Sequence, residues 1–189
     1  MCELIFRAAS MAENWHKGQV RKYTNQPYIT HPIRVAFAVM KSEIASQDTV
    51  AAAYLHDVVE DCGVSTETIA YRFNYKIASL VAELTNTAKV DIPNASRKER
   101  KAYDLNRIKI YSSREAKVIK MFDRIDNLGE YPLDNSEATK FLKQVYLDES
   151  FQLYHVLKDA DELLAARLLD KIDSVSRQIG GLRYECCNY

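Results

Sequence analysis

The sequence predicts an all-α protein, and three observations support this fold class. Apolar residues recur at spacings of three and four through most of the chain, which is the period of an amphipathic helix. Five glycines and four prolines in 189 residues provide few of the turns that a β-sandwich or β-barrel needs. No segment shows the strict alternation of polar and apolar residues typical of a half-buried strand. We expect roughly seven to nine helices.

Capping residues and helix breakers set the expected boundaries in the first half of the chain. A polar loop over 21–30 ends at Thr30, which is the expected cap of the second helix. That helix has a proline in its first turn, where the missing N–H group costs no hydrogen bond. Asp48 is the expected cap of a third helix, which stops near Gly63, and Ser65 opens a short fourth helix. The expected helices cover residues 4–15, 32–40, 51–61, 65–73 and 75–85.

The second half of the chain shows the same helical period. Two helices are expected over 96–111 and 114–131, and the periodicity resumes after Pro132 until about residue 179. No linker, repeat or low-complexity tract divides the chain. We therefore expect a single domain over 1–189, in which 159–189 form a helical C-terminal extension without an assigned role.

Composition and charge exclude several classes of function. Lysine and arginine total 26, as do aspartate and glutamate, so the net charge is zero and a surface built for nucleic acid is not expected. No segment reaches the ~20 consecutive apolar residues of a membrane span, and the N-terminus does not have the pattern of a signal peptide. The cysteines form no CxxC pair, which predicts free thiols in a reducing cytoplasm. They are Cys2, Cys62, Cys186 and Cys187.

The densest group of ionisable residues is the segment His56-Asp57-Val58-Val59-Glu60-Asp61. Helical spacing would place His56 on one face with Glu60, and Asp57 with Asp61. The preceding residues are apolar enough to be buried, and buried carboxylates need a charged partner or a metal ion. The alternative is a solvated helix end, although acidic residues at a helix C-terminus oppose the helix dipole. The segment therefore indicates a metal or catalytic site.

Two further residues extend this group to a possible ligand set. His31 precedes a proline at an expected helix start, where a histidine can also be a capping or surface group. Asp123 lies in a strongly apolar helical segment, where Lys120 or Arg124 could be its ion-pair partner. Two imidazoles and two carboxylates are then available, from His31, His56, Asp57 and Asp123. This mixed set suits Mn²⁺, Fe²⁺, Zn²⁺ or another divalent ion, with positions left for water and substrate.

These motifs resemble those of the HD-domain phosphohydrolases, whose signature is the order H…HD…D. The resemblance is closest to the alarmone hydrolase branch, the small stand-alone relatives of the hydrolase domain in the RelA/SpoT proteins. It covers about residues 1–150. It rests on four segments in this order, which are Gln19-Val20-Arg21-Lys22, Tyr28-Ile29-Thr30-His31-Pro32, Ala53-Tyr54-Leu55-His56-Asp57-Val58-Val59-Glu60-Asp61 and Ile119-Lys120-Met121-Phe122-Asp123-Arg124-Ile125-Asp126-Asn127-Leu128.

The resemblance implies an HD-type helical bundle with one divalent metal site. In that family the two histidines and two aspartates hold one Mn²⁺, so the expected ligands are His31, His56, Asp57 and Asp123. Glu60 and Asp61 match the acidic pair that positions and deprotonates the attacking water. The implied reaction is Mn²⁺-dependent hydrolysis of the 3′-pyrophosphate of ppGpp or pppGpp, which releases pyrophosphate and GDP or GTP.

The resemblance also implies a nucleotide site. The residues that match nucleotide-contacting positions of similar hydrolases are Arg21, Lys22, Asn127, Arg97 and Tyr146. Forked guanidinium groups suit a pyrophosphate. From the residues alone, the basic ones could instead be solvated surface groups, and Tyr146 a core residue. Asn86 and Thr87 stand where many alarmone hydrolases have an acidic pair, and Phe122 replaces a small alanine, so base specificity or rate could differ.

Two other functions remain as alternatives at this point. The first is hydrolysis of another phosphorylated nucleotide, such as an adenine alarmone, a 5′-nucleotide or NADPH. The second is a non-catalytic alarmone sensor, or an antitoxin partner of a synthetase. The presence of every ligand together with Glu60 and Asp61 favours catalysis. The expected partner is a small nucleotide, with neither nucleic acid nor membrane involved, and the sequence predicts no oligomeric state.

Overall fold

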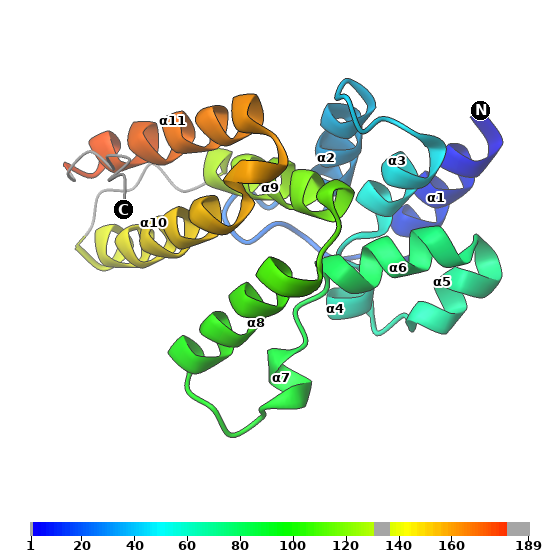
Figure 1. The fold of residues 1–189 in the computed structure, drawn as a ribbon, viewed down its shortest axis with the longest axis horizontal. Helices are drawn as coiled ribbons and strands as arrows, with labels where there is room; N and C mark the ends of the chain where they lie inside the picture. Colours follow the sequence, from blue (N-terminus) through cyan, green and yellow to red (C-terminus); the bar gives the residue numbers. More distant parts are fainter. Residues whose placement is uncertain (1, 131–136, 181–189) are drawn as a thin grey trace.

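In the computed structural model, which describes residues 2–130 and 137–180, helices joined by short loops form the fold (Figure 1). The all-α class is confirmed, and the described part contains no β-structure beyond an isolated bridge between Val20 and Pro27. None of the described helices combines the length and apolar character that crossing a membrane requires. The elements are α1 (Cys2–Trp15), α2 (Thr30–Met40), α3 (Gln47–Leu55), α4 (Val58–Cys62), α5 (Thr66–Arg72), α6 (Tyr75–Leu84), α7 (Ala88–Asp91), α8 (Arg97–Tyr111), α9 (Arg114–Gly129), α10 (Glu137–Leu157), the 3₁₀ turn η1 (Lys158–Ala160) and α11 (Glu162–Gln178).

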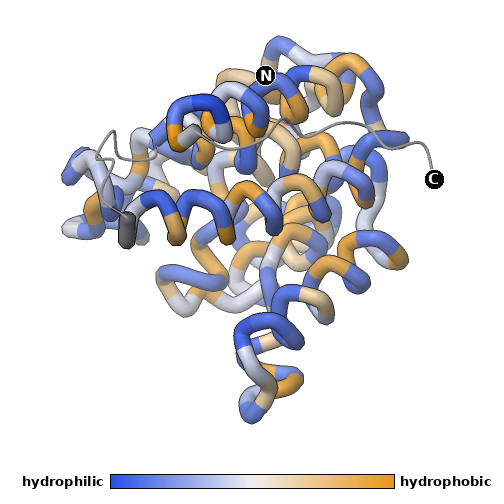
Figure 2. The backbone as a smooth tube through the Cα atoms, turned by 90° about the vertical axis from the view of Figure 1, so that its left-hand side faces the viewer, coloured by the Kyte–Doolittle hydropathy of each residue, from blue (hydrophilic) through white to orange (hydrophobic). Residues whose placement is uncertain are grey.

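Two helices, α3 and α9, organise the core. α3 packs against α1, α2 and α6, and the small side chains of Ala51, Ala52 and Ala53 are fully buried, which lets the helices approach closely. α9 contacts α2, α3, α6, α10 and α11, and it buries Ile119 and Met121 completely. Hydrophobic residues recur between hydrophilic ones along the helices, as amphipathic packing requires (Figure 2).

The C-terminal helices join the same core. α10 and α11 lie side by side, and α9 connects them to the helices of the N-terminal half (Figure 1). Leu168 of α11 is fully buried, in the same hydrophobic cluster as Ala8 of α1. We therefore propose that α11, which lies in the predicted extension 159–189, belongs to one domain with the rest of the chain. Residues 181–189 lie outside the described residues.

α7 and the start of α8 project from the bundle (Figure 1). α8 begins with a capping box, in which the Ser96 hydroxyl accepts a hydrogen bond from the Glu99 backbone and the Glu99 carboxylate accepts one from the Ser96 backbone. This cap fixes the start of a helix whose first turns carry Arg97, Arg100 and Lys101.

The caps of α2 and α3 differ from those predicted. Thr30 is the first residue of α2, and its hydroxyl donates a hydrogen bond of 2.8 Å to the Pro27 carbonyl rather than capping the helix. α3 is capped by Ser46, which forms a capping box with Thr49. Asp48 lies inside the first turn of α3, where its carboxylate accepts a hydrogen bond of 2.9 Å from Asn74. The cap at Ser65 is confirmed.

The single helix predicted over 51–61 is interrupted. α3 ends at Leu55 and α4 begins at Val58, so that His56 and Asp57 lie in the connection between them. α4 ends as predicted at Gly63, whose φ of +66° is in the left-handed region that favours glycine. The described chain has eleven α-helices, more than the roughly seven to nine expected, because this break and the short α7 add helices that periodicity does not separate.

We predict that Leu168→Ala lowers the free energy of unfolding by about 2–5 kcal/mol, because it leaves a cavity in the shared core. Leu163→Ala, in the same helix but 78% exposed, is the matched control and should change it by less than about 0.5 kcal/mol. Urea unfolding followed by circular dichroism measures both. Two separate unfolding transitions, with only one affected by Leu168→Ala, would contradict a single domain.

Candidate metal centre and adjoining cavities

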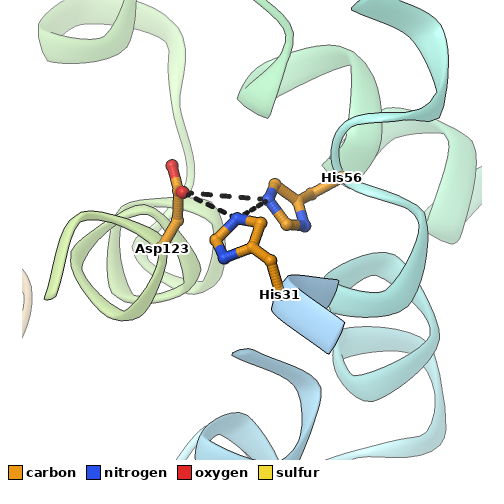
Figure 3. Close-up of side chains that lie close together, drawn as sticks. All are labelled: His31, His56 and Asp123. Atoms are coloured by element: carbon orange, nitrogen blue, oxygen red, sulfur yellow. Dashed lines mark hydrogen bonds and ion pairs between the residues drawn. The ribbon is translucent and has the colours of Figure 1, made fainter. Parts of the chain in front are cut away.

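Three buried side chains from three helical segments converge on one point. Figure 3 shows the imidazoles of His31 and His56 and the carboxylate of Asp123 pointing toward one another. His31 lies in the first turn of α2, His56 directly follows α3, and Asp123 lies within α9. His31 Nε2 is 3.2 Å from His56 Nε2 and 3.2 Å from Asp123 Oδ1, and one ligand atom from each residue lies within 4.8 Å of the others. The structure thus brings together three of the four predicted ligands.

Asp57, the fourth predicted ligand, lies beside this cluster. Its Oδ2 is 3.1 Å from His56 Nε2 and 3.6 Å from His31 Nε2. The same oxygen accepts a hydrogen bond of 2.8 Å from the hydroxyl of Tyr28. Tyr28 was not predicted as a site residue, and it fixes the orientation of this carboxylate.

The hydrogen bonds around the two imidazoles define a set of atoms that fits a divalent cation. His31 Nδ1 donates to Asp126 Oδ2 at 2.6 Å, and His56 Nδ1 donates to the Ala53 carbonyl at 2.8 Å. Because each Nδ1 then carries a proton, the neutral form of each imidazole directs the lone pair of its Nε2 at the common point. Two imidazole nitrogens and carboxylate oxygens facing one another inside the protein need a positive charge between them. A mixed nitrogen and oxygen set of this kind suits a divalent metal ion.

The pKa values of these groups have the same physical origin. Burial disfavours a protonated His31, but hydrogen bonds to Asp123 and Asp126 outweigh it and raise the pKa of His31 to about 9. Burial also opposes protonation of His56, yet the charge of Asp57 raises the pKa of His56. In spite of burial, the neighbouring His56 lowers the pKa of Asp57. The surroundings of these groups therefore favour positive charge between the imidazoles and negative charge on the carboxylates.

Asp123 also has a lysine partner. Lys120 Nζ is 2.9 Å from Asp123 Oδ2, and both side chains are buried. Although burial alone would raise the pKa of Asp123, the charge of Lys120 holds it well below its usual value. The ion pair with Lys120 considered from the sequence therefore exists, and it occupies the oxygen that does not face His31. The other candidate partner, Arg124, instead lies over the ring of Tyr146 at 4.4 Å.

Several residues of the centre were not predicted from the sequence. Arg34 donates through Nε and Nη2 to both carboxylate oxygens of Asp126, at 2.7 and 2.9 Å. Arg34 also contacts Glu130. The available signal was helical spacing, since Arg34 follows His31 by three residues and Asp126 follows Asp123 by three.

The predicted acidic pair occupies α4. Asn86 donates three hydrogen bonds to the Glu60 carboxylate, one from its backbone at 2.7 Å and two from its side chain at 3.0 and 3.1 Å. Although Glu60 is partly exposed, desolvation of its carboxylate raises its pKa. Asp61 is exposed, and its backbone carbonyl accepts a hydrogen bond from Gln19 at 3.0 Å. Asn86, one of the departures from the family pattern, therefore orients Glu60.

One cavity of about 340 Å³ adjoins the centre through Asn127, whose side chain donates to Asp123 Oδ1 at 2.5 Å. Four of the five predicted nucleotide-contacting residues lie on its wall. The guanidinium of Arg21 lies 5.3 Å from the ring centre of Tyr28, so aromatic and cationic surfaces meet there. The cavity is lined by Val20, Arg21, Lys22, Tyr23, Tyr28, Asn127, Glu130 and Tyr146.

A second cavity, of about 230 Å³, has Glu60 on its wall, three residues along the chain from Asp57. Its wall carries four cationic side chains. One of them is Arg97, the fifth predicted nucleotide-contacting residue, which is paired with Glu149 at 2.7 Å. Such a concentration of Lys and Arg side chains favours a polyanionic ligand. The cavity is lined by Glu60, Asn86, Lys89, Arg97, Arg100, Lys101 and Asp104.

An all-α chain in which two buried histidines and a buried aspartate from separate helical segments face one point has the residues that a helical protein needs to hold a divalent metal ion. The profile of the HD domain family matches residues 8–163. The chain belongs to the HD domain family.

Similar proteins include both long bacterial chains and short ones. The chain is 31% identical over 163 residues to a probable guanosine-3′,5′-bis(diphosphate) 3′-pyrophosphohydrolase of Mycoplasma genitalium, with 80% of this chain and 21% of that protein covered. The chain thus spans about a fifth of the length of this and similar bacterial relatives. It is 30% identical over 169 residues to the guanosine-3′,5′-bis(diphosphate) 3′-pyrophosphohydrolase MESH1 of Xenopus tropicalis, with 87% and 90% covered.

A solved structure gives a likeness over the whole fold. It is described as a metazoan ortholog of SpoT that hydrolyses ppGpp and plays a role in starvation responses. Its TM-score is 0.77 at 27% sequence identity, and the match covers 96% of this chain and 98% of that one. The arrangement of helices is therefore shared with this neighbour along nearly its entire length.

We predict that Mn²⁺ raises the Tm of this protein and that His56→Ala removes the effect, because a ligand present at 100 times its Kd stabilises the folded state by about 2.7 kcal/mol. His155→Ala is the matched control, since His155 lies on α10 and is exposed. Differential scanning fluorimetry in EDTA and in Mn²⁺ measures the shift. A Tm increase of equal size in His56→Ala would argue against this cation site.

Proposed function

We propose that this chain is a Mn²⁺-dependent 3′-pyrophosphohydrolase that converts ppGpp or pppGpp into pyrophosphate and GDP or GTP. The relatives named above, long and short, carry this activity in their names. The identity of the nucleotide is proposed from those relatives and from the cavities of this chain. The use of manganese is proposed from the resemblance to the same family.

The observation that carries the proposal is that two differently built cavities contain residues next to the candidate cation site, namely Asn127 beside Asp123 and Glu60 three residues after Asp57. The cavity of Arg21 and Tyr28 offers an aromatic ring and a guanidinium, which suit a nucleobase and a phosphate. The cavity of Glu60 offers Lys89, Arg100 and other cations, which suit a pyrophosphate. A guanosine nucleotide with a 3′-pyrophosphate has both parts, on either side of the bond that is broken.

The chain's own residues supply positioning and proton transfer. A divalent ion held by His31, His56, Asp57 and Asp123 would activate water and neutralise charge on phosphoryl oxygens. Glu60 accepts the proton of the water whose oxygen bonds to the 3′-linked phosphorus, and its raised pKa suits that role. The bond between this phosphorus and the 3′ oxygen breaks, the 3′ oxygen takes up a proton, and pyrophosphate leaves.

Two kinds of residue hold the reacting groups in place. Asn86 contacts both oxygens of Glu60, which fixes the direction of the base. Asp61 lies one residue further in α4 and is assigned to water orientation. Arg97 and Lys101 both lie near Glu149 on the wall of the cavity of Glu60, and their exposed cationic groups are available to a pyrophosphate there.

We also propose that the protein works in the cytoplasm. Cys62 is a free thiol among the described residues, which is typical of a reducing compartment. Cys186 and Cys187 lie outside the described residues, and Cys2 lies at the start of α1.

The first test is a metal-dependent assay across a nucleotide panel. We expect ppGpp with Mn²⁺ to yield equal amounts of pyrophosphate and GDP, with loss of turnover in EDTA and in Asp57→Ala. Chromatography of the products separates this outcome from the alternatives. Preference for an adenine alarmone or NADPH, or orthophosphate released from a 5′-nucleotide, would identify another hydrolase. Tight binding without turnover would identify a sensor.

The second test addresses Glu60. We expect Glu60→Gln to lower kcat by about 10²–10⁴-fold, because it removes the proton acceptor, and to leave Mn²⁺ affinity unchanged. In the native enzyme the carboxylate is the active form, so kcat should fall as pH decreases through a pKa above the usual 4.5. Steady-state kinetics from pH 4 to 9 measures both effects. The control is Glu13→Gln at the exposed end of α1; equal losses in the two variants would refute the role of Glu60.

A further inference from the structure

Glu130, the residue that follows α9, contacts two arginines that lead to different parts of the site. Its Oε2 accepts a hydrogen bond of 2.5 Å from Arg21 Nε. Its Oε1 accepts one from Nη2 of Arg34. Only 14% of the Glu130 side chain is exposed, so water compensates little for the loss of either partner.

The first connection runs through Arg21 to the metal centre. Arg21 lines the cavity proposed for the nucleoside, where its guanidinium lies over Tyr28. Arg21 Nη2 donates to Asn127 Oδ1 at 2.6 Å, and Asn127 Nδ2 donates to Asp123 Oδ1 at 2.5 Å. The nucleoside cavity and a predicted metal ligand are therefore joined by two consecutive hydrogen bonds.

The second connection runs through Arg34 to the other side of the same centre. Arg34 holds both oxygens of Asp126, and Asp126 accepts the hydrogen bond of His31 Nδ1. A carboxylate behind a ligand histidine fixes the direction of its ring and raises its basicity. The two connections meet again where His31 Nε2 faces Asp123 Oδ1 at 3.2 Å, which closes a ring.

We propose that Glu130 is a positioning residue that orients Arg21 in the nucleotide cavity and, through Arg34 and Asp126, orients His31 in the metal centre. This inference rests on the proposed function for the identity of the nucleotide. Because one carboxylate serves both connections, a nucleotide that engages Arg21 changes the bonds available to Arg34. Cation and nucleotide then bind cooperatively, and by linkage each tightens the other by the same factor.

The metal side of the proposal is tested with Mn²⁺ alone, by isothermal titration of the nucleotide-free protein. Glu130→Gln is expected to weaken Mn²⁺ binding about 10-fold, the lower end of the effect of residues behind a ligand. If Glu130 acts through Arg34, the same substitution should have no further effect in an Arg34→Gln background. Glu43→Gln is the matched control, since Glu43 is 84% exposed and pairs with Arg114 at 3.5 Å. Unchanged Mn²⁺ affinity in Glu130→Gln overturns the proposal.

The coupling is tested by titrating GDP with and without Mn²⁺. In the native chain Mn²⁺ is expected to tighten GDP binding at least about 5-fold, the lower end of allosteric coupling. In Glu130→Gln this factor should fall below about 2-fold. A factor that stays at the native value shows that GDP and the cation interact directly, and it overturns the role of Glu130.

Circular dichroism and Tm confirm that the variants fold. If Glu130→Gln does not fold, Glu130→Asp, which keeps the charge but shortens its reach, carries the same expectations. The Mn²⁺ titration is independent of the reaction. A chain that behaved as expected with Mn²⁺ yet left ppGpp intact would contradict the proposed function and leave the metal side of this proposal in place.

Discussion

The burial of hydrogen-bond acceptors around one point is the constraint on which the rest of the structure depends. His31, His56 and Asp123 are buried away from water. Each directs one nitrogen or oxygen atom that can bind a cation at the other two residues. Such a cluster is stable in the interior only when its other polar atoms form hydrogen bonds and a cation balances its negative charge. From α9, Lys120 places a positive charge beside Asp123, and Asp126 accepts the hydrogen bond of His31 Nδ1. The close packing of α2, α3 and α9 serves to hold these side chains together.

The sequence predicts the fold class because apolar periodicity reports directly on helices that share a core. It also predicts the end of α4 at Gly63 and the start of α5 at Ser65, since these two residues cap helices through local backbone chemistry. The break after Leu55 could not be predicted, because His56 and Asp57 are both compatible with a continuing helix. Their side chains contact His31 and Asp123, which are distant in the sequence, and periodicity contains no information about those partners.

The site residues also fall into those that the sequence predicts and those that it does not. The four predicted ligands could be named because ionisable groups in apolar helices are unusual, and the family resemblance added their order. Arg34, Asp126 and Glu130 could not be named, since charged residues on amphipathic helices are normally solvated. Their partners lie some ninety or more residues away in the chain. Asn127, expected at the nucleotide, lines the cavity and also links Asp123 to Arg21, so its amide lies between the candidate cation site and the cavity.

The acidic pair lies in α4, after the break at His56 and Asp57, whereas the other two predicted ligands lie in α2 and α9. Glu60 and Asp61 belong to a helix of five residues, whereas His31 and Asp123 belong to helices of eleven and sixteen residues. A short helix opens at lower free energy than a long one packed on several neighbours. A change confined to α4 can therefore alter Glu60 and Asp61 and leave the packing around His31 and Asp123 intact, so the chemistry at this surface can vary separately from the interior.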